Sequence, residues 1–354
     1  MRKSLTVLVV LLVLGITGCT NGISYIRGHD IGYFVCDSNR PIISENNSDA
    51  YDWSPDGRYL AHTKRNARTG RNGLFVRIMR NRVDRQMVSH TVTDVNFTFD
   101  WSPDGDAIVF EHNNCPGCNG NISRVEMDNG VISLLTPLTS NDSQPAWAPG
   151  GDRIAFVSER SATGLDIFWM NSDGTSRTRL TNSEENDSYP VWSPDSTRIA
   201  FIRRQTASPW RASIATVARD ETGGAVMMLV TGLQDIGSLS WSPDGSKLLF
   251  HGREVGRDRS AIYTVNSDAS NLTQISNISN GIYREVDDMF PSWSPNGSKI
   301  AFTRSARFTL DDGIGYSVQG MLFQMDANGM NKRRLGDLEF KAVTAWRPSK
   351  NLCL

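Results

Sequence analysis

The amino-acid sequence predicts an all-β fold, a β-propeller in which four-stranded antiparallel sheets, the blades, stack around an axis. Two observations predict it. A tryptophan followed two residues later by proline recurs seven times, at separations of 45 to 53 residues, and the first six copies each precede a short apolar run at the same offset. Because one such sheet cannot bury both of its faces, neighbouring repeats must pack against each other.

The first copy of the repeat shows how each blade is expected to fold. It reads Asp52-Trp-Ser-Pro-Asp-Gly57, and an apolar run over 59–62 follows it. Proline presets φ and glycine accepts a positive φ, so this sequence predicts a tight turn between two strands. Later apolar runs, such as 166–170, and short closing runs, such as 179–181, predict the third and fourth strands. The repeated tryptophans are expected to pack between blades: Trp53, Trp101, Trp147, Trp192, Trp241, Trp293 and Trp346.

Both ends of the chain are expected to contribute to the closing blade. Trp346 and residues 351–354 can supply its first and second strands, while 32–37 and 41–44 resemble a third and a fourth. Joining the two ends leaves only short, protected sheet edges. This predicts seven blades. Six blades with a loosely attached tail is the alternative.

The first 19 residues have the pattern of an export signal. Arg2 and Lys3 precede a short aliphatic run, and Ile16-Thr-Gly-Cys19 follows it. This segment resembles the signal of bacterial lipoproteins, which implies that Cys19 becomes the lipidated N-terminus of the mature protein, anchored at the cell envelope. The alternative is an ordinary cleaved signal with a chance cysteine. The predicted organisation is a signal peptide over 1–18, a tether over 19–31 and one propeller domain over 32–354.

The repeated Trp-Ser-Pro-Asp-Gly with its following Ile-Ala-Phe resembles the WD-like propeller repeat of the TolB family, over roughly 25–354. That family includes TolB and the propeller domains of prolyl-oligopeptidase-type peptidases. TolB carries an α/β domain before a six-bladed propeller, and only about thirty residues separate Cys19 from Trp53 here. The resemblance therefore implies the propeller and leaves the role of TolB in doubt.

Four further cysteines are expected to form disulfides in an oxidising compartment. Cys36 and Cys353 fall on predicted neighbouring strands of the closing blade, so a bond between them would close the ring. Cys115 and Cys118 form a Cys-Pro-Gly-Cys in a loop. A small disulfide is the favoured interpretation there, since no second pair at metal-ligand spacing accompanies it.

Composition and loop sequences limit the expected function. With 37 Lys+Arg against 38 Asp+Glu, the chain lacks the positive charge that drives nucleic-acid binding. Binding residues are expected on the face that carries the irregular loops. The candidates there are acidic or aromatic: Asp94, Glu184, Glu185, Asp187, Tyr189, Tyr283, Asp287 and Asp288. They favour a non-catalytic binding or scaffold module for an envelope protein, peptide or glycan.

An enzyme is the alternative. The sequence contains no Gly-x-Ser-x-Gly nucleophile motif, but His62, His112 and His251 all lie near the ends of predicted second strands. Some similar propellers are polysaccharide lyases that use clustered histidines and a metal. Here the three histidines belong to different repeats, so no catalytic residue, metal or cofactor is assigned. A carbohydrate-active enzyme with its site in the channel remains the second hypothesis.

Overall fold

The structure is a computed structural model, and it describes the backbone of residues 22–27, 30–35, 50–81, 83–89, 94–113, 120–160, 164–206, 211–220, 225–276, 285–309, 316–335 and 344–346. All regular elements in these ranges are β-strands. No helix within them is long and apolar enough to cross a membrane.

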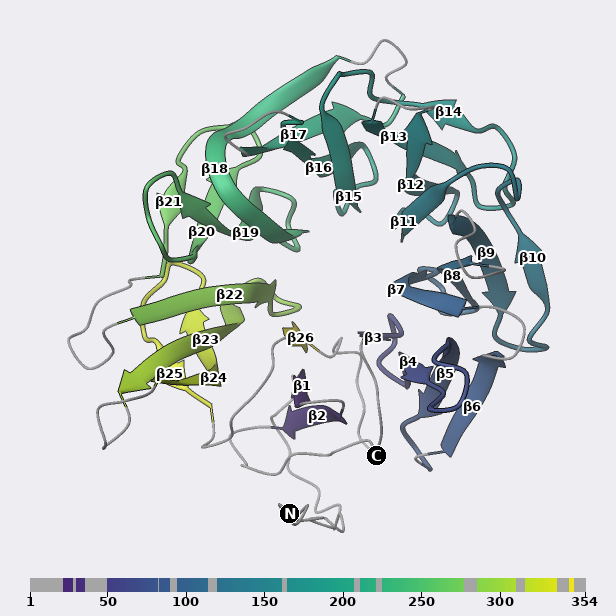
Figure 1. The fold of residues 1–354 in the computed structure, drawn as a ribbon, viewed down its shortest axis with the longest axis horizontal. Helices are drawn as coiled ribbons and strands as arrows, with labels where there is room; N and C mark the ends of the chain where they lie inside the picture. The colour runs from purple at the N-terminus through teal and green to yellow at the C-terminus, as the bar shows by residue number, and fades with distance from the viewer. Residues whose placement is uncertain are drawn as a thin grey trace.

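Antiparallel sheets follow one another around a central axis, with the first strand of each innermost (Figure 1). We call each four-stranded unit a blade. The first blade contains β3 (Tyr51–Trp53), β4 (Tyr59–Arg65), β5 (Asn72–Ile78) and β6 (Val83–Val88). The second contains β7 (Asp94–Trp101), β8 (Ala107–Asn113), β9 (Gly120–Glu126) and β10 (Ile132–Leu134). The third contains β11 (Asp142–Trp147), β12 (Arg153–Arg160), β13 (Gly164–Asn171) and β14 (Thr178–Arg179).

The fourth and fifth blades share a strand. The fourth contains β15 (Asn186–Trp192), β16 (Arg198–Arg204), β17 (Ala212–Ala218) and the first part of β18 (Val226–Trp241). The fifth contains the last part of β18, then β19 (Lys247–Glu254), β20 (Ala261–Asn266) and β21 (Thr273–Gln274). Leu233 of β18 pairs with Ala212 on one side and with Glu254 on the other. The two blades therefore form one seven-stranded sheet.

The sixth blade contains β22 (Glu285–Trp293), β23 (Lys299–Thr309), β24 (Tyr316–Asp326) and β25 (Arg333–Arg334). Beside it lies a three-stranded sheet in the order β2 (Asp30–Val35), β1 (Gly22–Arg27) and β26 (Thr344–Trp346). The prediction that strands from both ends of the chain close the ring is confirmed. Whether this sheet completes a seventh blade stays a prediction.

The closing sheet differs from the prediction in its second strand. That strand is β1, where Ile23 pairs with Trp346, and not 351–354. β1 also lies inside the segment expected to be a tether, so the paired part of the chain starts before residue 32. The physical reason is local. β1 and β2 form a hairpin with Arg27 opposite Asp30, and a short loop closes at a lower entropic cost than a long one. Residues 41–44 and 351–354 lie outside the described ranges.

The turn after each tryptophan is held by its own side chains. The Ser54 hydroxyl donates to Asp56 Oδ1 at 2.7 Å and accepts the Tyr59 N–H at 2.9 Å. Gly57 has a φ of 69° and donates its N–H to the Ser54 carbonyl. The same serine bond closes four of the later copies, at Ser102, Ser193, Ser242 and Ser294, whereas the third copy has Ala148 at this position. These hydrogen bonds within the turn thus account for the constant spacing of serine, aspartate and glycine where they recur in the chain.

The hydrophobic core lies between blades. Each cluster of buried side chains combines residues of two neighbours; one joins Leu74 and Val76 of the first blade to Trp101 and Phe110 of the second. The first six repeated tryptophans are all buried. The side chain of Trp346 lies outside the described part. Blade stacking is therefore the main source of buried apolar surface.

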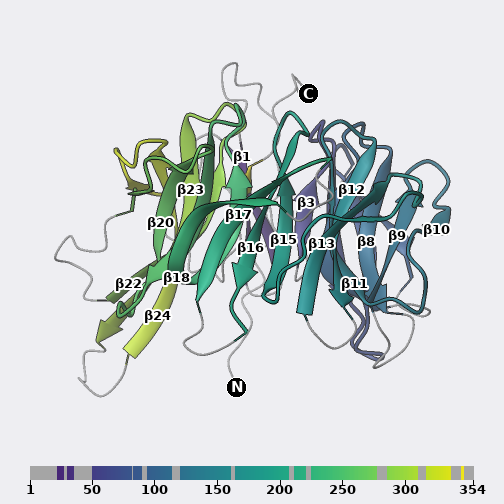
Figure 2. The ribbon, with the colours of Figure 1, turned by 90° about the horizontal axis from the view of Figure 1, so that it is seen from above.

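Strands run roughly along the axis, so their ends form two faces (Figure 2). Since neighbouring strands are antiparallel, the first-to-second and third-to-fourth connections share one face, which we call the turn face. The second-to-third connections and those between blades share the other, the loop face.

Candidate functional site

The innermost strands bulge near the loop face, always at the same distance from the tryptophan. In four blades the pairing register between the first and second strands shifts around one residue, which lies three positions before the repeated tryptophan. These residues have left-handed backbones: Gln144 (φ 52°), Tyr189 (φ 56°), Ser238 (φ 52°) and Phe290 (φ 53°). A β-bulge redirects a side chain, so the repeat presents these four in an equivalent way.

Hydrogen bonds connect the bulges from blade to blade. The side chains of Asn96 and Thr98 donate to the Glu111 carboxylate, which also accepts the Gln144 N–H at 3.1 Å. The Gln144 side-chain oxygen in turn accepts the Tyr189 N–H at 2.6 Å. A continuous polar chain therefore joins the second, third and fourth blades.

Arg204 extends this chain to the fifth blade. Its guanidinium donates to the Ser188 hydroxyl at 2.8 Å and to the Ile236 carbonyl at 3.1 Å. The guanidinium also lies 5.2 Å from the ring centroid of Tyr189, and Tyr189 is 49% exposed. We call Glu111, Gln144, Tyr189, Arg204 and Phe290 the inner rim. Tyr189 offers an exposed aromatic face whose neighbouring cation is already held in place.

Phe290 and His251 form the apolar side of the inner rim. Their ring centroids are 5.4 Å apart. Gly237 lets the His251 ring lie directly against the backbone of β18, since a Cβ on Gly237 would lie 2.6 Å from His251 Cε1. Burial lowers the pKa of His251 to about 4, against a smaller opposing effect of Asp235. The imidazole is therefore neutral at pH 7.

Two predicted acidic candidates, Asp187 and Asp288, are fully buried in ion pairs. Asp187 accepts two hydrogen bonds from Arg203, at 2.7 and 2.8 Å. Asp288 accepts two from Arg304, both at 2.7 Å. Each pair satisfies the carboxylate within its own blade. Neither side chain is accessible to a partner.

The other candidates have different surroundings. Asp94 and Asp287 each accept a backbone N–H from the preceding blade, of Asn72 and Ser260 respectively, at 2.8 Å. Glu184 is exposed. Glu185 is half-buried, with Oε2 3.8 Å from Nε of Arg203. Tyr283 lies outside the described residues. Of the predicted candidates that the structure describes, only Tyr189 belongs to the inner rim.

The structure adds two carboxylates that the sequence interpretation did not select. Asp100 accepts the N–H of Trp101 at 2.9 Å and, across the blade boundary, that of Trp147 at 2.6 Å. Burial of the carboxylate raises the pKa of Asp100 to about 7, although the residue as a whole is only half-buried. Burial, and then the charge of Asp100, raises the pKa of Asp52. The sequence feature that could have identified them is an aspartate directly before each of the first two repeated tryptophans.

The described histidines do not form a common site. His62 and His112 are buried in separate blades, where His62 lies 3.5 Å from Asp84 and His112 lies 2.8 Å from the Ser123 hydroxyl. The described side chains include no group of three His, Cys, Asp or Glu arranged to hold a metal. Cys19, Cys36, Cys115, Cys118 and Cys353 lie outside the described ranges.

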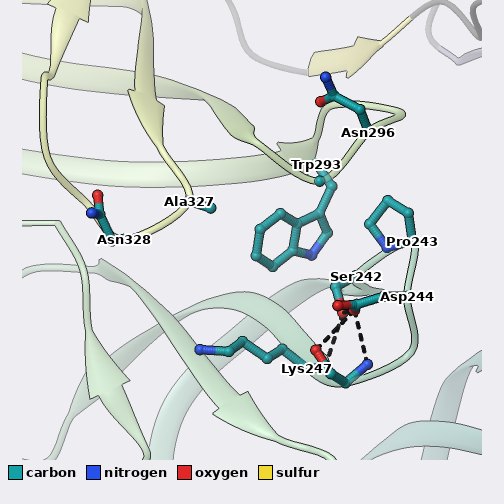
Figure 3. Close-up of a pocket in the computed structure, with 10 residues that line it drawn as sticks. Ser242, Pro243, Asp244, Lys247, Trp293, Asn296, Ala327 and Asn328 are labelled. Atoms are coloured by element: carbon teal, nitrogen blue, oxygen red, sulfur yellow. Dashed lines mark hydrogen bonds between the residues drawn. The ribbon is translucent and has the colours of Figure 1, made fainter.

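A separate cavity of about 510 Å³ opens between the fifth and sixth blades, at the turn face. Figure 3 shows the Trp293 ring in it, between the turn of Pro243 and Asp244 and that of Ala327 and Asn328. We call it the interblade cavity.

The comparison with protein families decides the family. The model of the TolB beta propeller domain matches residues 32–286. The chain belongs to the TolB β-propeller domain family. An uncharacterized protein of Agrobacterium fabrum is 31% identical over 126 residues, a match that covers 32% of this chain and 40% of that protein. The chain thus spans well under half of this relative's length.

Solved structures share the fold of this TolB-type propeller. TolB from Acinetobacter baumannii is 17% identical, with a TM-score of 0.56 over 91% of this chain and 80% of that one. An oligogalacturonate lyase in complex with manganese is 14% identical, with a TM-score of 0.62 over 90% and 85%. The propeller domain of the Trilobed protease from Pyrococcus furiosus is 13% identical, with a TM-score of 0.59 over 87% of each chain. At these identities the likeness concerns the fold alone.

Proposed function

We propose that this chain is a non-catalytic binding module of the cell envelope, anchored through a lipid on Cys19, which holds a protein or glycan partner at the inner rim. The observation that carries the proposal is the exposed ring of Tyr189 beside the fixed guanidinium of Arg204. Tyrosine and arginine dominate binding energy at protein interfaces, and aromatic faces also stack on ligands.

The backbone of the inner rim supports this role. A bulky residue in the left-handed region costs about 1 to 3 kcal/mol, and such strain persists where the surrounding structure enforces it. Tyr189 and Phe290 both carry it, on rigid strands and two blades apart. A rigid platform reduces the ordering cost of binding.

The chemistry of the described residues favours binding over catalysis. The carboxylates of Asp187 and Asp288 are buried against arginines, and the His251 side chain is buried too. Glycoside cleavage by the common route needs two carboxylates on either side of the bond. A carbohydrate-active enzyme remains the alternative, and release of unsaturated products from polygalacturonate by the purified protein would favour it.

The anchor is tested by cell fractionation and mass spectrometry. The wild-type protein is expected in the membrane fraction, with an N-terminal peptide that begins at an acylated Cys19. Cys19→Ser is expected to leave the membrane fraction, because a single apolar anchor is removed. An unmodified Cys19 in membrane-associated protein would contradict the proposed lipid.

The partner is tested by crosslinking in intact cells followed by affinity purification. Tyr189→Ala is expected to lose the partner that wild type recovers. Leu138→Ala is the matched control, since Leu138 is a 58% exposed apolar residue outside the inner rim. Equal recovery by Tyr189→Ala and wild type would overturn the inner rim as the binding site.

A further inference from the structure

Arginine side chains close four successive gaps between blades at the turn face. Each guanidinium donates to a backbone carbonyl of the following blade. The pairs are Arg85 with Met127 (2.5 Å), Arg124 with Ser172 (3.3 Å), Arg153 with Arg219 (3.4 Å) and Arg198 with Ser267 (3.2 Å). The four residues that supply these carbonyls occupy equivalent positions. The backbone N–H of each donates to the carbonyl of the residue just before the second strand of the same blade.

The next gap, between the fifth and sixth blades, has a lysine where an arginine would stand. Ala327 is the equivalent acceptor residue, because its N–H donates to the Ser298 carbonyl at 3.0 Å. Lys247 begins the second strand, as Arg153 and Arg198 do in their blades. Among the described contacts, the Lys247 ammonium makes no bond to Ala327. A guanidinium is longer and carries more donors than an ammonium, so the lysine leaves this gap open.

The interblade cavity lies in this gap, and its tryptophan lacks a bond that two of its counterparts make. Trp192 and Trp241 donate from Nε1 to a carbonyl of the preceding blade, at 3.1 and 3.2 Å. Trp293 is only 9% exposed, yet its Nε1 has no acceptor among the described residues. The boundary between the fifth and sixth blades therefore combines an open cavity with a buried donor that has no acceptor among the described residues.

We propose that the interblade cavity binds the arginine side chain of a partner polypeptide. The chain itself shows the fit, because Arg124 lies 5.3 Å from the ring centroid of Trp147 while donating to the third blade. The corresponding ring here is Trp293, and the corresponding acceptor is the Ala327 carbonyl.

Charge does not oppose this occupant. Asp244 and Lys247 both line the cavity and their charges offset. Lys247 is exposed, so its ammonium can turn into solvent. The interblade cavity lies on the face opposite the inner rim, and the inference stands independently of the proposed function.

The test is a ¹⁹F NMR titration of the full mature protein labelled with 5-fluorotryptophan. Trp293→Phe assigns the resonance. The probe is the peptide acetyl-Gly-Arg-Gly-amide, with the matching lysine peptide and free arginine as comparisons. We expect a saturable shift of the Trp293 resonance with the arginine peptide, and about five-fold or more weaker binding of the lysine peptide. Binding of free arginine as tight as that of the peptide would contradict a polypeptide partner.

Two substitutions at one position give opposite predictions. Lys247→Arg is expected to close the cavity with the chain's own guanidinium and weaken peptide binding about ten-fold or more. Lys247→Ala removes a like charge and is expected to strengthen binding about two- to five-fold. Thermal unfolding verifies that each variant is folded. No saturable shift in the wild type, or unchanged binding by Lys247→Arg, would overturn the proposal.

Discussion

Arg304 donates two hydrogen bonds of 2.7 Å to the carboxylate of Asp288, and both side chains are buried. Its guanidinium also lies 5.7 Å from the ring centroid of Phe302 in the same strand. Arg203 repeats the arrangement with Asp187 and Phe201. These pairs are built into the blades, beneath the loops where their carboxylates were expected to act.

Removing the acid from this buried pair should destabilise the fold. Asp288→Ala removes the carboxylate that pairs with the buried guanidinium of Arg304, and we expect the free energy of unfolding to fall by about 3 to 5 kcal/mol. Arg257→Gln is the control, since its pair with Glu254 is exposed, and there we expect a change of at most about 0.5 kcal/mol. Urea denaturation measures both, and equal effects would contradict the structural role of the pair.

The raised pKa values of Asp52 and Asp100 predict a pH-dependent contribution to stability. Both groups bind a proton more tightly in the folded state, so their contribution is full below about pH 4 and is lost as the pH rises. For Asp100 the loss is centred on its folded pKa of about 7. Asp52→Asn removes one of the two interacting charges. We therefore expect this variant to lose less stability than wild type between pH 5 and pH 8.

The difference between variant and wild type is the quantity to measure, because other groups titrate in the same range. Asp106→Asn is the matched control, on an exposed residue in the second blade. It should keep the wild-type difference between the two pH values. If Asp52→Asn behaves like this control in urea unfolding, the two carboxylates are not linked to folding.

His251 should act in the opposite direction. Its folded pKa of about 4 lies below the ordinary value of 6.5, so its contribution is present above pH 6.5 and is lost as the pH falls toward 4. An NMR titration should show its Cε1–H resonance unchanged from pH 8 to about pH 5. A midpoint near 6.5 would show that burial does not hold the ring neutral.

Two glycines with left-handed backbones allow the steric cost of an added Cβ to be measured apart from the cost of the backbone conformation. A Cβ on Gly329 (φ 83°) would lie 2.5 Å from the Ile275 carbonyl oxygen, whereas one on Gly256 (φ 81°) would have nothing within 4 Å. We expect Gly256→Ala to cost about 1 kcal/mol, from the backbone conformation alone. Gly329→Ala should cost about 2 kcal/mol or more, because the neighbouring blade must also shift. Thermal denaturation of both variants tests the order.

The blade framework was predictable because its causes are local. Ser54, Asp56 and Gly57 close their turn within a few residues, and Ser-Pro followed by Asp or Asn recurs in five of the seven copies. The closing sheet was harder. Its second strand depends on whether residues near Ile23 or those beyond Trp346 pair first, and the repeat carries no information on that choice.

The candidate site was predictable only in part. Tyr189 was selected as one of several polar or aromatic loop residues, but the fate of Asp187 depends on an arginine sixteen residues further along the chain. The bulges did leave a signal. Gln144, Tyr189 and Phe290 are each followed directly by a proline, which lies two residues before the repeated tryptophan. A proline inside a strand is typical of a bulge.

The continuous β18 sets the fourth and fifth blades apart. Elsewhere a connection between blades can change length without altering either sheet, but Val226–Trp241 is hydrogen-bonded to β17 and to β19 along its course. One residue inserted near Leu233 would move a whole half-strand to the opposite face. Evolution should therefore tolerate insertions between most blades of this ring and reject them here, and fusion tags or circular permutations are best placed elsewhere.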